Sequence, residues 1–286
     1  MAKIKNPMTV VSAGGGSVIV SKSITQNGTY NASSDSADGY NPVTVNVPPT
    51  LFRELVDGSS FSVTAADVSG ITSIRQYAFA YSGIASVELP STITSIGQFA
   101  FEYCDNLTSA IFPAGATMGN SVFEYTRNIT NAVVPDVPQR TFYQGNFLVN
   151  VTVLEGATQV GQRGFYTCNR LTKLVLPSTI ASIASQAFQN ASSLIKLVLL
   201  PTSAPSLAST DAFSGVNANY VVYVPTPDVY KAATNWVSIA SHIFPLVATV
   251  ADLSNIDTTT YTKACVTGTG DYKEYTYDGS QWNEVV

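Results

Sequence analysis

Phenylalanine recurs along the middle of the chain at a nearly constant interval. The seven positions are Phe79, Phe101, Phe123, Phe142, Phe165, Phe188 and Phe213, which are 22, 22, 19, 23, 23 and 25 residues apart. In the first six units an aliphatic residue follows the Phe five or six positions later, and a short run rich in Val, Ile and Leu comes next. Most of these runs end in proline, as in VELP at Pro90 and LVLP at Pro177. Because proline has no N–H to give to a strand ladder, the pattern predicts one short strand per unit that ends at the proline.

A repeat of this length predicts a solenoid. Leu171, Leu174 and Leu176 complete a Leu-x-x-Leu-x-Leu core, which is typical of leucine-rich repeats. One strand and its turn cannot cover their own apolar side, so neighbouring units stack and their parallel strands pair about 4.8 Å apart. We therefore expect a mainly β fold with short helical or 3-10 turns and about seven repeats. The recurring Phe is expected to be the largest buried group of each unit, contributing about 1.5–3 kcal/mol.

The repeat unit resembles that of the BspA-like leucine-rich repeat family. Its pattern, AF-x-x-C-x-x-L-x-x-V-x-L-P, is matched by AFEYCDNLTSAIFP and GFYTCNRLTKLVLP, with TSIGQFAF between units. The resemblance covers about residues 51–246 and implies a leucine-rich repeat solenoid with caps. It places an entry cap in LVDGSSFSVTAADVSGITSIRQYAF and a closing unit around Tyr230, Trp236 and Pro245. The departures from the pattern predict irregular rungs within the same fold: they are Thr126, Gly145, Ala191 and the fourth unit, VTVLE, which lacks the proline.

Residues 1–50 differ from the repeats and predict an N-terminal β attachment module. Gly14–Gly16 is typical of a flexible joint, and Asn27-Gly28 is a strong hairpin signal. The combination ITQNGTYNAS and GYNPVTVNVP resembles a module near the start of structural proteins of phages that infect Gram-positive gut bacteria. That resemblance implies attachment to other virion proteins.

Residues 247–286 predict a second, small β module. The segment YKEYTYDGSQWNEVV alternates aromatic and polar residues around the turn signal Asp278-Gly279. It resembles the short β modules that finish phage fibre and decoration proteins. A unit of this size is too small to be stable alone, so we expect it to dock on the solenoid or to form a homotrimer.

A column of tyrosines is the first candidate binding surface. Tyr81, Tyr103 and Tyr125 each follow their Phe by two positions, whereas Tyr143 and Tyr166 stand one position earlier in the next two units. Stacked aromatic rings can lie against sugar faces or anchor a protein partner. The alternative interpretation is packing along the side of the solenoid, and the sequence leaves both open.

The outward positions of the strands are the second candidate surface. One row reads Glu88, Ile111, Val133, Thr152, Val175, Val198 and Tyr223, and the row beside it reads Ser86, Ser109, Asn131, Asn150, Lys173, Lys196 and Val221. Solenoids use such sheet faces for partners, and an apolar stripe at the surface often marks a contact. The equal alternative is that Val and Ile fill these positions because they favour strands.

Composition and charge exclude several classes of function. Charged residues make up 12% of the 286 residues and the net charge is −5, without the clustered cations that nucleic-acid binding needs. No apolar run approaches the roughly 20 residues that cross a bilayer, and no apolar stretch follows Lys3 and Lys5, so we expect neither membrane insertion nor a secretion signal.

The residues offer little chemistry for catalysis, metals or cofactors. A single histidine, His242, and three cysteines are too few for a transition-metal site, and the common catalytic motifs are missing. Cys104 and Cys168 hold equivalent positions three rungs, or about 14 Å, apart, which is too far for a disulfide. We expect both to be small buried apolar groups, and we expect His242 to be structural.

The leading hypothesis is a non-enzymatic phage virion protein on the particle exterior, at the tail or as a capsid fibre or decoration. Its solenoid would present a binding surface to a host protein or glycan. The alternative is a bacterial cell-surface BspA-like adhesin, and a depolymerase built on a β scaffold is a third, minor hypothesis.

Overall fold

The computed structural model describes residues 71–268 and 271–285, together with five short strands before them. These strands are β1 (Met8–Thr9), β2 (Ser17–Ser21), β3 (Thr29–Asn31), β4 (Thr44–Asn46) and β5 (Phe61–Val63). β3 and β4 pair in antiparallel fashion, and β2 pairs in parallel with β6 (Ile71–Ile74). The predicted Gly14–Gly16 joint and Asn27-Gly28 turn lie outside the described residues.

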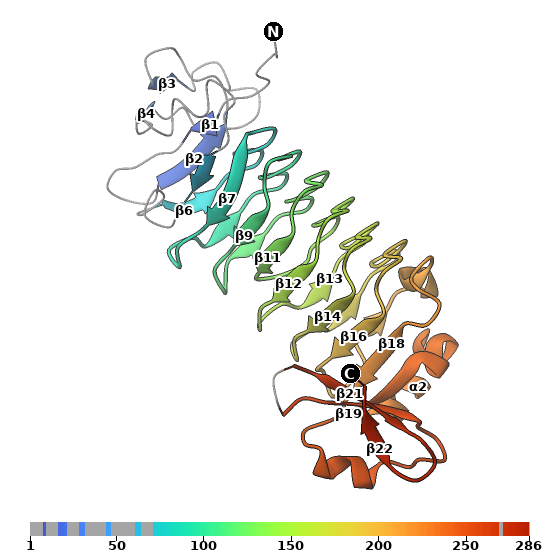
Figure 1. Cartoon of the computed structure of the whole chain (residues 1–286). Helices are drawn as coiled ribbons and strands as arrows, with labels where there is room; N and C mark the ends of the chain where they lie inside the picture. The colour runs from blue at the N-terminus through green and yellow to red at the C-terminus, as the bar shows by residue number, and fades with distance from the viewer. Residues whose placement is uncertain are drawn as a thin grey trace.

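The repeats form a solenoid with one long strand per turn (Figure 1). These strands are β7 (Ile84–Glu88), β9 (Ser109–Ile111), β11 (Asn131–Val134), β12 (Asn150–Val153), β14 (Lys173–Leu176), β16 (Lys196–Leu199) and β18 (Val221–Val224). They run parallel, and all neighbours except β12 and β14 pair in register, as with Asn131 opposite Asn150 and Lys173 opposite Lys196. The predicted fold class, a mainly β leucine-rich repeat solenoid, is confirmed.

Short strands on the return side of each coil form a second face. They are β8 (Ser95–Ile96), β10 (Thr117–Met118), β13 (Gln159–Val160), β15 (Ser182–Ile183) and β17 (Ser206–Leu207). The third unit has no such strand, and only an isolated bridge joins Val137 to Val160. This unit spans 19 residues from Phe123 to Phe142, against 22 in the units before it, so its return leg is too short for a full strand.

A continuous stack of phenylalanine rings fills the centre of the coils. Successive rings from Phe79 to Phe213 have centroids 4.8–5.7 Å apart, and all but Phe213, which is 6% exposed, are fully buried. Each ring therefore covers the one below it, as the stacking of identical units requires. The predicted burial of the Phe column is confirmed.

The column that holds cysteine in the repeat pattern forms hydrogen bonds between rungs. The Sγ atom of Cys104 donates to the carbonyl of Phe79 at 3.0 Å, and that of Cys168 donates to the carbonyl of Phe142 at 3.4 Å. Thr126 departs from the pattern but keeps this bond, since its hydroxyl donates to the carbonyl of Phe101. The cysteines are buried and unbonded to each other, as predicted.

Two columns of turn residues have left-handed backbone conformation, with φ between 52° and 62°. The first is Tyr77, Phe99, Ser121, Arg140, Arg163 and Gln186, and the second is Tyr81, Tyr103, Tyr125, Gln144, Thr167 and Asn190. Most of their N–H groups donate to a carbonyl of the next coil, as from Tyr81 to the carbonyl of Glu102 at 2.8 Å. These bonds between rungs hold a backbone conformation that costs non-glycine residues about 1 kcal/mol each.

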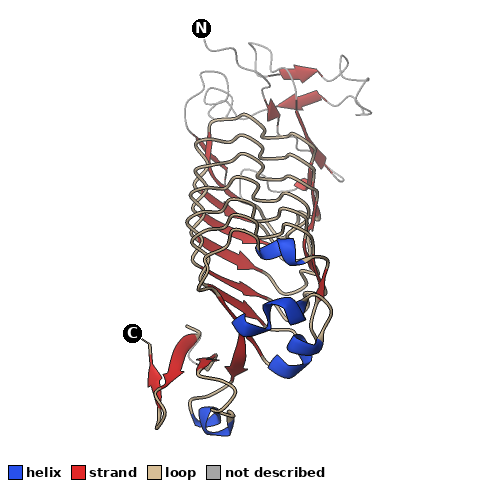
Figure 2. Ribbon diagram, turned by 90° about the vertical axis from the view of Figure 1, so that its right-hand side faces the viewer, coloured by secondary structure: helices blue, strands red, loops and turns tan. Residues whose placement is uncertain are grey.

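The closing unit covers the last coil with short helices: η3 (Thr210–Phe213), α2 (Pro227–Ala232) and η4 (Trp236–His242). Figure 2 shows them gathered at one end of the stacked coils. The indole Nε1 of Trp236 donates to the carbonyl of Pro205 at 2.7 Å, and the Tyr230 hydroxyl donates to that of Pro201 at 2.9 Å. His242 lies against Tyr220, with ring centroids 4.1 Å apart and Nδ1 2.8 Å from the Tyr220 carbonyl oxygen, and so is structural as expected.

The C-terminal unit continues the solenoid sheet. β19 (Ile243–Val247) pairs with β18 and then with β20 (Lys263–Val266), both in parallel, while η5 (Ala251–Asn255) lies between β19 and β20 in sequence. β21 (Lys273–Tyr277) and β22 (Trp282–Glu284) add an antiparallel hairpin. The turn at Asp278-Gly279 is confirmed, with the Asp278 carboxylate accepting from the N–H of Ser280 at 2.8 Å. The described residues include no helix long and apolar enough to span a bilayer.

Candidate binding surface

The outward side of strands β7 to β14, here called the open strand face, is the first candidate surface. Ile111 is 43% exposed, Glu88 and Thr152 are exposed, and Val133 and Val175 are half-buried. The ladder pairs Val133 with both Ile111 and Thr152, so these side chains form one continuous row. The face thus has an apolar stripe of Ile111 and Val133, with the polar Glu88 and Thr152 on either side of it.

The polar row beside the stripe is ordered by hydrogen bonds. Asn131 and Asn150 stand opposite each other, and the Asn150 amide donates to Asn131 Oδ1 at 2.8 Å. The Asn131 amide in turn donates to the Thr130 hydroxyl at 2.8 Å. These bonds fix the amides on the surface, which reduces the entropy lost when a ligand binds them.

The last two strands of the predicted surface are covered. Val198 and Tyr223 are buried with Leu246 and Cys265 in an apolar cluster under the C-terminal unit. Their assignment to an exposed surface is therefore corrected. The predicted row of outward positions places both residues correctly on the outer side of β16 and β18. The chain, however, returns over that side after β20.

Polar contacts fix the C-terminal unit on β16 and β18. The Lys196 amine lies 3.2 Å from Glu274 Oε2 and also donates to the Tyr272 carbonyl. The Tyr223 hydroxyl donates to Glu274 Oε1 at 2.8 Å. Lys196 is 8% exposed, so it too leaves the predicted surface, and the predicted docking of residues 247–286 is confirmed.

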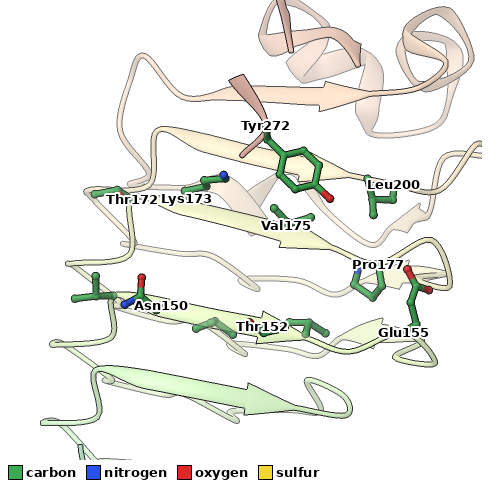
Figure 3. A pocket seen from close by; sticks show the side chains of 12 residues that line it. Asn150, Thr152, Glu155, Thr172, Lys173, Val175, Pro177, Leu200 and Tyr272 are labelled. Atoms are coloured by element: carbon green, nitrogen blue, oxygen red, sulfur yellow. The ribbon is translucent and has the colours of Figure 1, made fainter. Parts of the chain in front are cut away.

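The C-terminal unit, here also called the C-terminal cover, lies over β16 and β18. At its edge, between β12 and β14, a groove of about 630 Å³ opens (Figure 3). Val175 and Thr152 lie along it, Glu155 and Lys173 lie toward its two ends, and the Tyr272 ring stands over it. The Lys173 amine donates to the Asp271 carbonyl at 2.8 Å and lies 5.0 Å from the centre of the Tyr272 ring. Sequence reasoning missed Tyr272, because no local pattern shows that the C-terminal unit returns to this strand. It treated Glu155 only as part of the irregular fourth unit, VTVLE.

The tyrosine column is the second candidate surface. Ring centroids of Tyr81, Tyr103 and Tyr125 are 4.8 and 4.6 Å apart and nearly parallel, and those of Tyr143 and Tyr166 are 4.9 Å apart. Between Tyr125 and Tyr143 the rings meet at 86°, since Tyr143 stands one position earlier in its unit. Tyr81 is 50% exposed, so the column both packs along the solenoid and offers a ring edge to solvent.

Two glutamates lie beside the tyrosines on adjacent coils. Glu124 is buried and forms an ion pair with Arg140 at 3.3 Å, while the Arg140 guanidinium lies 4.4 Å from the centre of the Tyr143 ring. Burial, and then the nearby charge of Glu124, raises the pKa of Glu102 to about 7. Glu102 therefore titrates near neutral pH.

The three buried cysteine thiols are expected to be unreactive near neutral pH. Burial raises the pKa of Cys104 to about 12 and that of Cys265 to about 11, and it raises the pKa of Cys168 as well. Since the thiolate is the reactive form, these groups are poor nucleophiles near neutral pH. The part of the chain that the structure describes holds no cluster of three or more His, Cys, Asp or Glu side chains that could bind a metal.

Comparison with known proteins matches the repeats to one family. The family described as "BspA type Leucine rich repeat region" matches in six copies, over residues 59–138 and 117–229. No curated protein matches the chain.

Solved leucine-rich repeat proteins are similar at low identity. One from Bacteroides ovatus is 22% identical, over 54% of this chain and 40% of that one, with a TM-score of 0.48. A leucine-rich cell surface protein from Faecalibacterium prausnitzii is 19% identical over 78% and 55% of the two chains, with a TM-score of 0.46. The leucine-rich repeat protein of T. pallidum is 19% identical over 67% and 75%, with a TM-score of 0.38. The chain thus spans less than two thirds of the first two proteins.

Proposed function

The chain belongs to the BspA-type leucine-rich repeat family, and from that premise we propose that it is a non-enzymatic binding protein that adheres to a surface protein or glycan through the open strand face. The observation that carries the proposal is the uncovered apolar row beside ordered amides. Ile111 is 43% exposed although it stands in the middle of a sheet, on a scaffold whose core is otherwise closely packed. A rigid face with an apolar stripe and a polar margin has the composition of a protein contact surface.

Binding of the full chain to mucin-coated surfaces and to intact Gram-positive gut bacteria tests this proposal. Ile111→Lys and Val133→Lys place charges in the stripe and are expected to weaken adhesion at least about tenfold, because they bury an unpaired charge in the contact. Thr117→Lys is the matched control, since Thr117 is exposed on β10 of the return face. If all three variants adhere as strongly as the native chain, the open strand face is not the contact surface.

The second candidate function is that of a phage virion protein, and two terminal segments of the sequence favour it. The N-terminal ITQNGTYNAS and the C-terminal YTYDGSQW resemble segments of phage structural proteins. In this setting the protein belongs to the exterior of a phage particle, at the tail or as a capsid decoration, and other virion proteins hold its N-terminal module. Mass spectrometry of purified particles is expected to detect the chain, and its absence from particles would reject this setting.

The alternative setting is the surface of a bacterium. Fractionation of phage-free cells that places the protein at the cell surface would favour it over the particle. Homotrimer formation also stays a prediction, which light scattering of the purified chain tests in either setting.

A further inference from the structure

The sheet ladder of the solenoid is interrupted at one place along the described strand face. β12 ends a sheet formed with β11, β9, β7 and β5, and β14 begins the next sheet with β16 and β18. Every other consecutive pair of long strands from β7 to β18 shares a paired register in the described residues. The interruption leaves the facing edges of β12 and β14 with hydrogen-bonding capacity that the ladder does not use.

The groove of about 630 Å³ lies directly over this interruption. Its volume is within the range of small-molecule sites, about 300–1,000 Å³. An added peptide strand does not fit between β12 and β14, because it needs roughly 9.6 Å between them whereas their Cα atoms approach within 8 Å. The occupant must therefore lie on the sheet.

An aromatic ring covers one side of the groove and is held there under strain. Tyr272 has φ of 52°, and outside the two turn columns the only other described non-glycine residue with positive φ is Asn235. The Tyr272 carbonyl accepts from Lys196 and, at 3.2 Å, from the Sγ atom of Cys265, which holds this backbone in place. Strain that the surroundings enforce is often found at ligand-binding sites.

Polar groups surround the ring and the apolar floor. Val175 forms part of the floor, and the Thr152 hydroxyl and Asn150 amide lie on β12 across from it. The Lys173 amine uses one donor on Asp271, and Glu155 accepts from the Ser178 N–H and hydroxyl at 3.2 and 3.0 Å. The groove thus joins one aromatic face to short polar side chains of both donor and acceptor type.

We propose that this groove, here called the Tyr272 groove, binds one or two pyranose units of a glycan. The C–H face of a pyranose matches the Tyr272 ring, and its hydroxyls can both donate to and accept from the amide, hydroxyl, ammonium and carboxylate groups around the ring. The inference rests on the proposed adhesive function and names the ligand class for one part of the open strand face.

Calorimetric titration of the full chain with maltotriose and with chitotriose tests the Tyr272 groove. At least one trisaccharide is expected to bind with a Kd below about 1 mM, and Tyr272→Ala is expected to raise that Kd at least about tenfold. Tyr77→Ala is the matched control, since Tyr77 is also an exposed tyrosine with positive φ, 59°, but belongs to neither candidate surface, and it is expected to leave the Kd unchanged.

A second variant distinguishes the loss of a sugar contact from detachment of the C-terminal cover. Thr152→Phe fills the groove from β12 while Tyr272 and its contacts stay in place, and it is expected to weaken binding to the same degree. Hydrogen exchange of β20–β22 checks that the cover stays docked in both variants. Failure of both sugars to bind at about 10 mM, or unchanged affinity in Tyr272→Ala and Thr152→Phe, would overturn the inference. If adhesion still depends on Ile111 in that case, the proposed function stands without the groove.

Discussion

The Lys196 amine lies 3.2 Å from the Glu274 carboxylate and joins β16, near the end of the solenoid, to the C-terminal hairpin. Lys196 is 10% exposed and Glu274 30% exposed in their side chains, so water shields this pair only partly. Glu274 also accepts from the buried Tyr223 hydroxyl at 2.8 Å. The pair therefore adds a charged contact to the apolar cluster that covers β16 and β18.

Lys196→Met is expected to loosen the C-terminal cover. Removal of one partner leaves Glu274 beside the apolar cluster without its cation, which we expect to cost about 1–3 kcal/mol, less than for a fully buried pair. Urea unfolding measures the loss, and faster hydrogen exchange in β20–β22 locates it. Lys273→Met is the control, because Lys273 pairs with Glu284 at 2.8 Å on the exposed hairpin and is expected to matter little. Similar effects of the two variants would contradict the assigned role of Lys196.

Phe101→Ala and Phe165→Ala are expected to destabilise the solenoid by about 3–5 kcal/mol each, as large core truncations do. Each removes one ring from a fully buried stack and leaves a cavity between two coils. Thermal and urea unfolding measure the effect, with Tyr81→Ala as the exposed control. An unfolding midpoint that barely moves in the Phe variants would mean that the stack does not support the fold.

The core of this protein could be predicted from the sequence because its signal is local and repeated. Phe101 and Cys104 lie within one unit, so their spacing alone places them on the inner side of the coil. The irregular third coil is likewise visible in the interval from Phe123 to Phe142. Burial and hydrogen bonding of these residues agree with that local pattern.

The candidate surface could be predicted only in part, because its extent depends on contacts between distant segments. Ile111 and Val133 remain at the surface, whereas Tyr223 has the same position in its unit and is buried by residues that follow β20. The Tyr272 groove depends on the same return of the chain and on a ladder interruption that no repeat position encodes. Periodicity gives the direction of a side chain, but it does not tell what later covers it.

Thr167→Asn is expected to stabilise the protein by about 1 kcal/mol. Thr167 has φ of 61°, a left-handed conformation that a β-branched residue tolerates poorly and asparagine tolerates better. Asn190 occupies the equivalent position one coil later, with φ of 60°. Asn190→Thr is therefore the matched control and is expected to destabilise by a similar amount. Urea unfolding of both variants checks the pair, and shifts in the same direction would contradict the argument.

The three cysteines are expected to react with a thiol reagent only after unfolding. Cys104, Cys168 and Cys265 are each fully buried, and burial raises the pKa of every one of them. Absorbance with an aromatic disulfide reagent at pH 8 is expected to show almost no reaction of the native chain and three reactive thiols in urea. Rapid reaction of one native thiol would indicate that its part of the solenoid opens.

Glu102 is expected to make the stability of the solenoid depend on pH. Burial and the neighbouring Glu124 raise its pKa from the usual 4.5 to about 7, while Arg140 pairs with Glu124 and Tyr81 stacks nearby on Tyr103. Between these two pKa values the folded chain binds more protons than the unfolded chain, so the contribution of Glu102 to stability falls as pH rises through this window. Below the window Glu102 is protonated in both states and imposes no penalty.

The variant Glu102→Gln removes this titration and is expected to gain stability relative to the native protein as pH rises from about 4.5 to 7. The unfolding midpoint in urea, measured at several pH values in constant salt, gives the comparison. Glu88→Gln is the control, since Glu88 is exposed on the strand face and is expected to keep the native pH slope. A native slope retained in Glu102→Gln would show that another group titrates there, and the Glu102–Glu124 pair would then have no part in it.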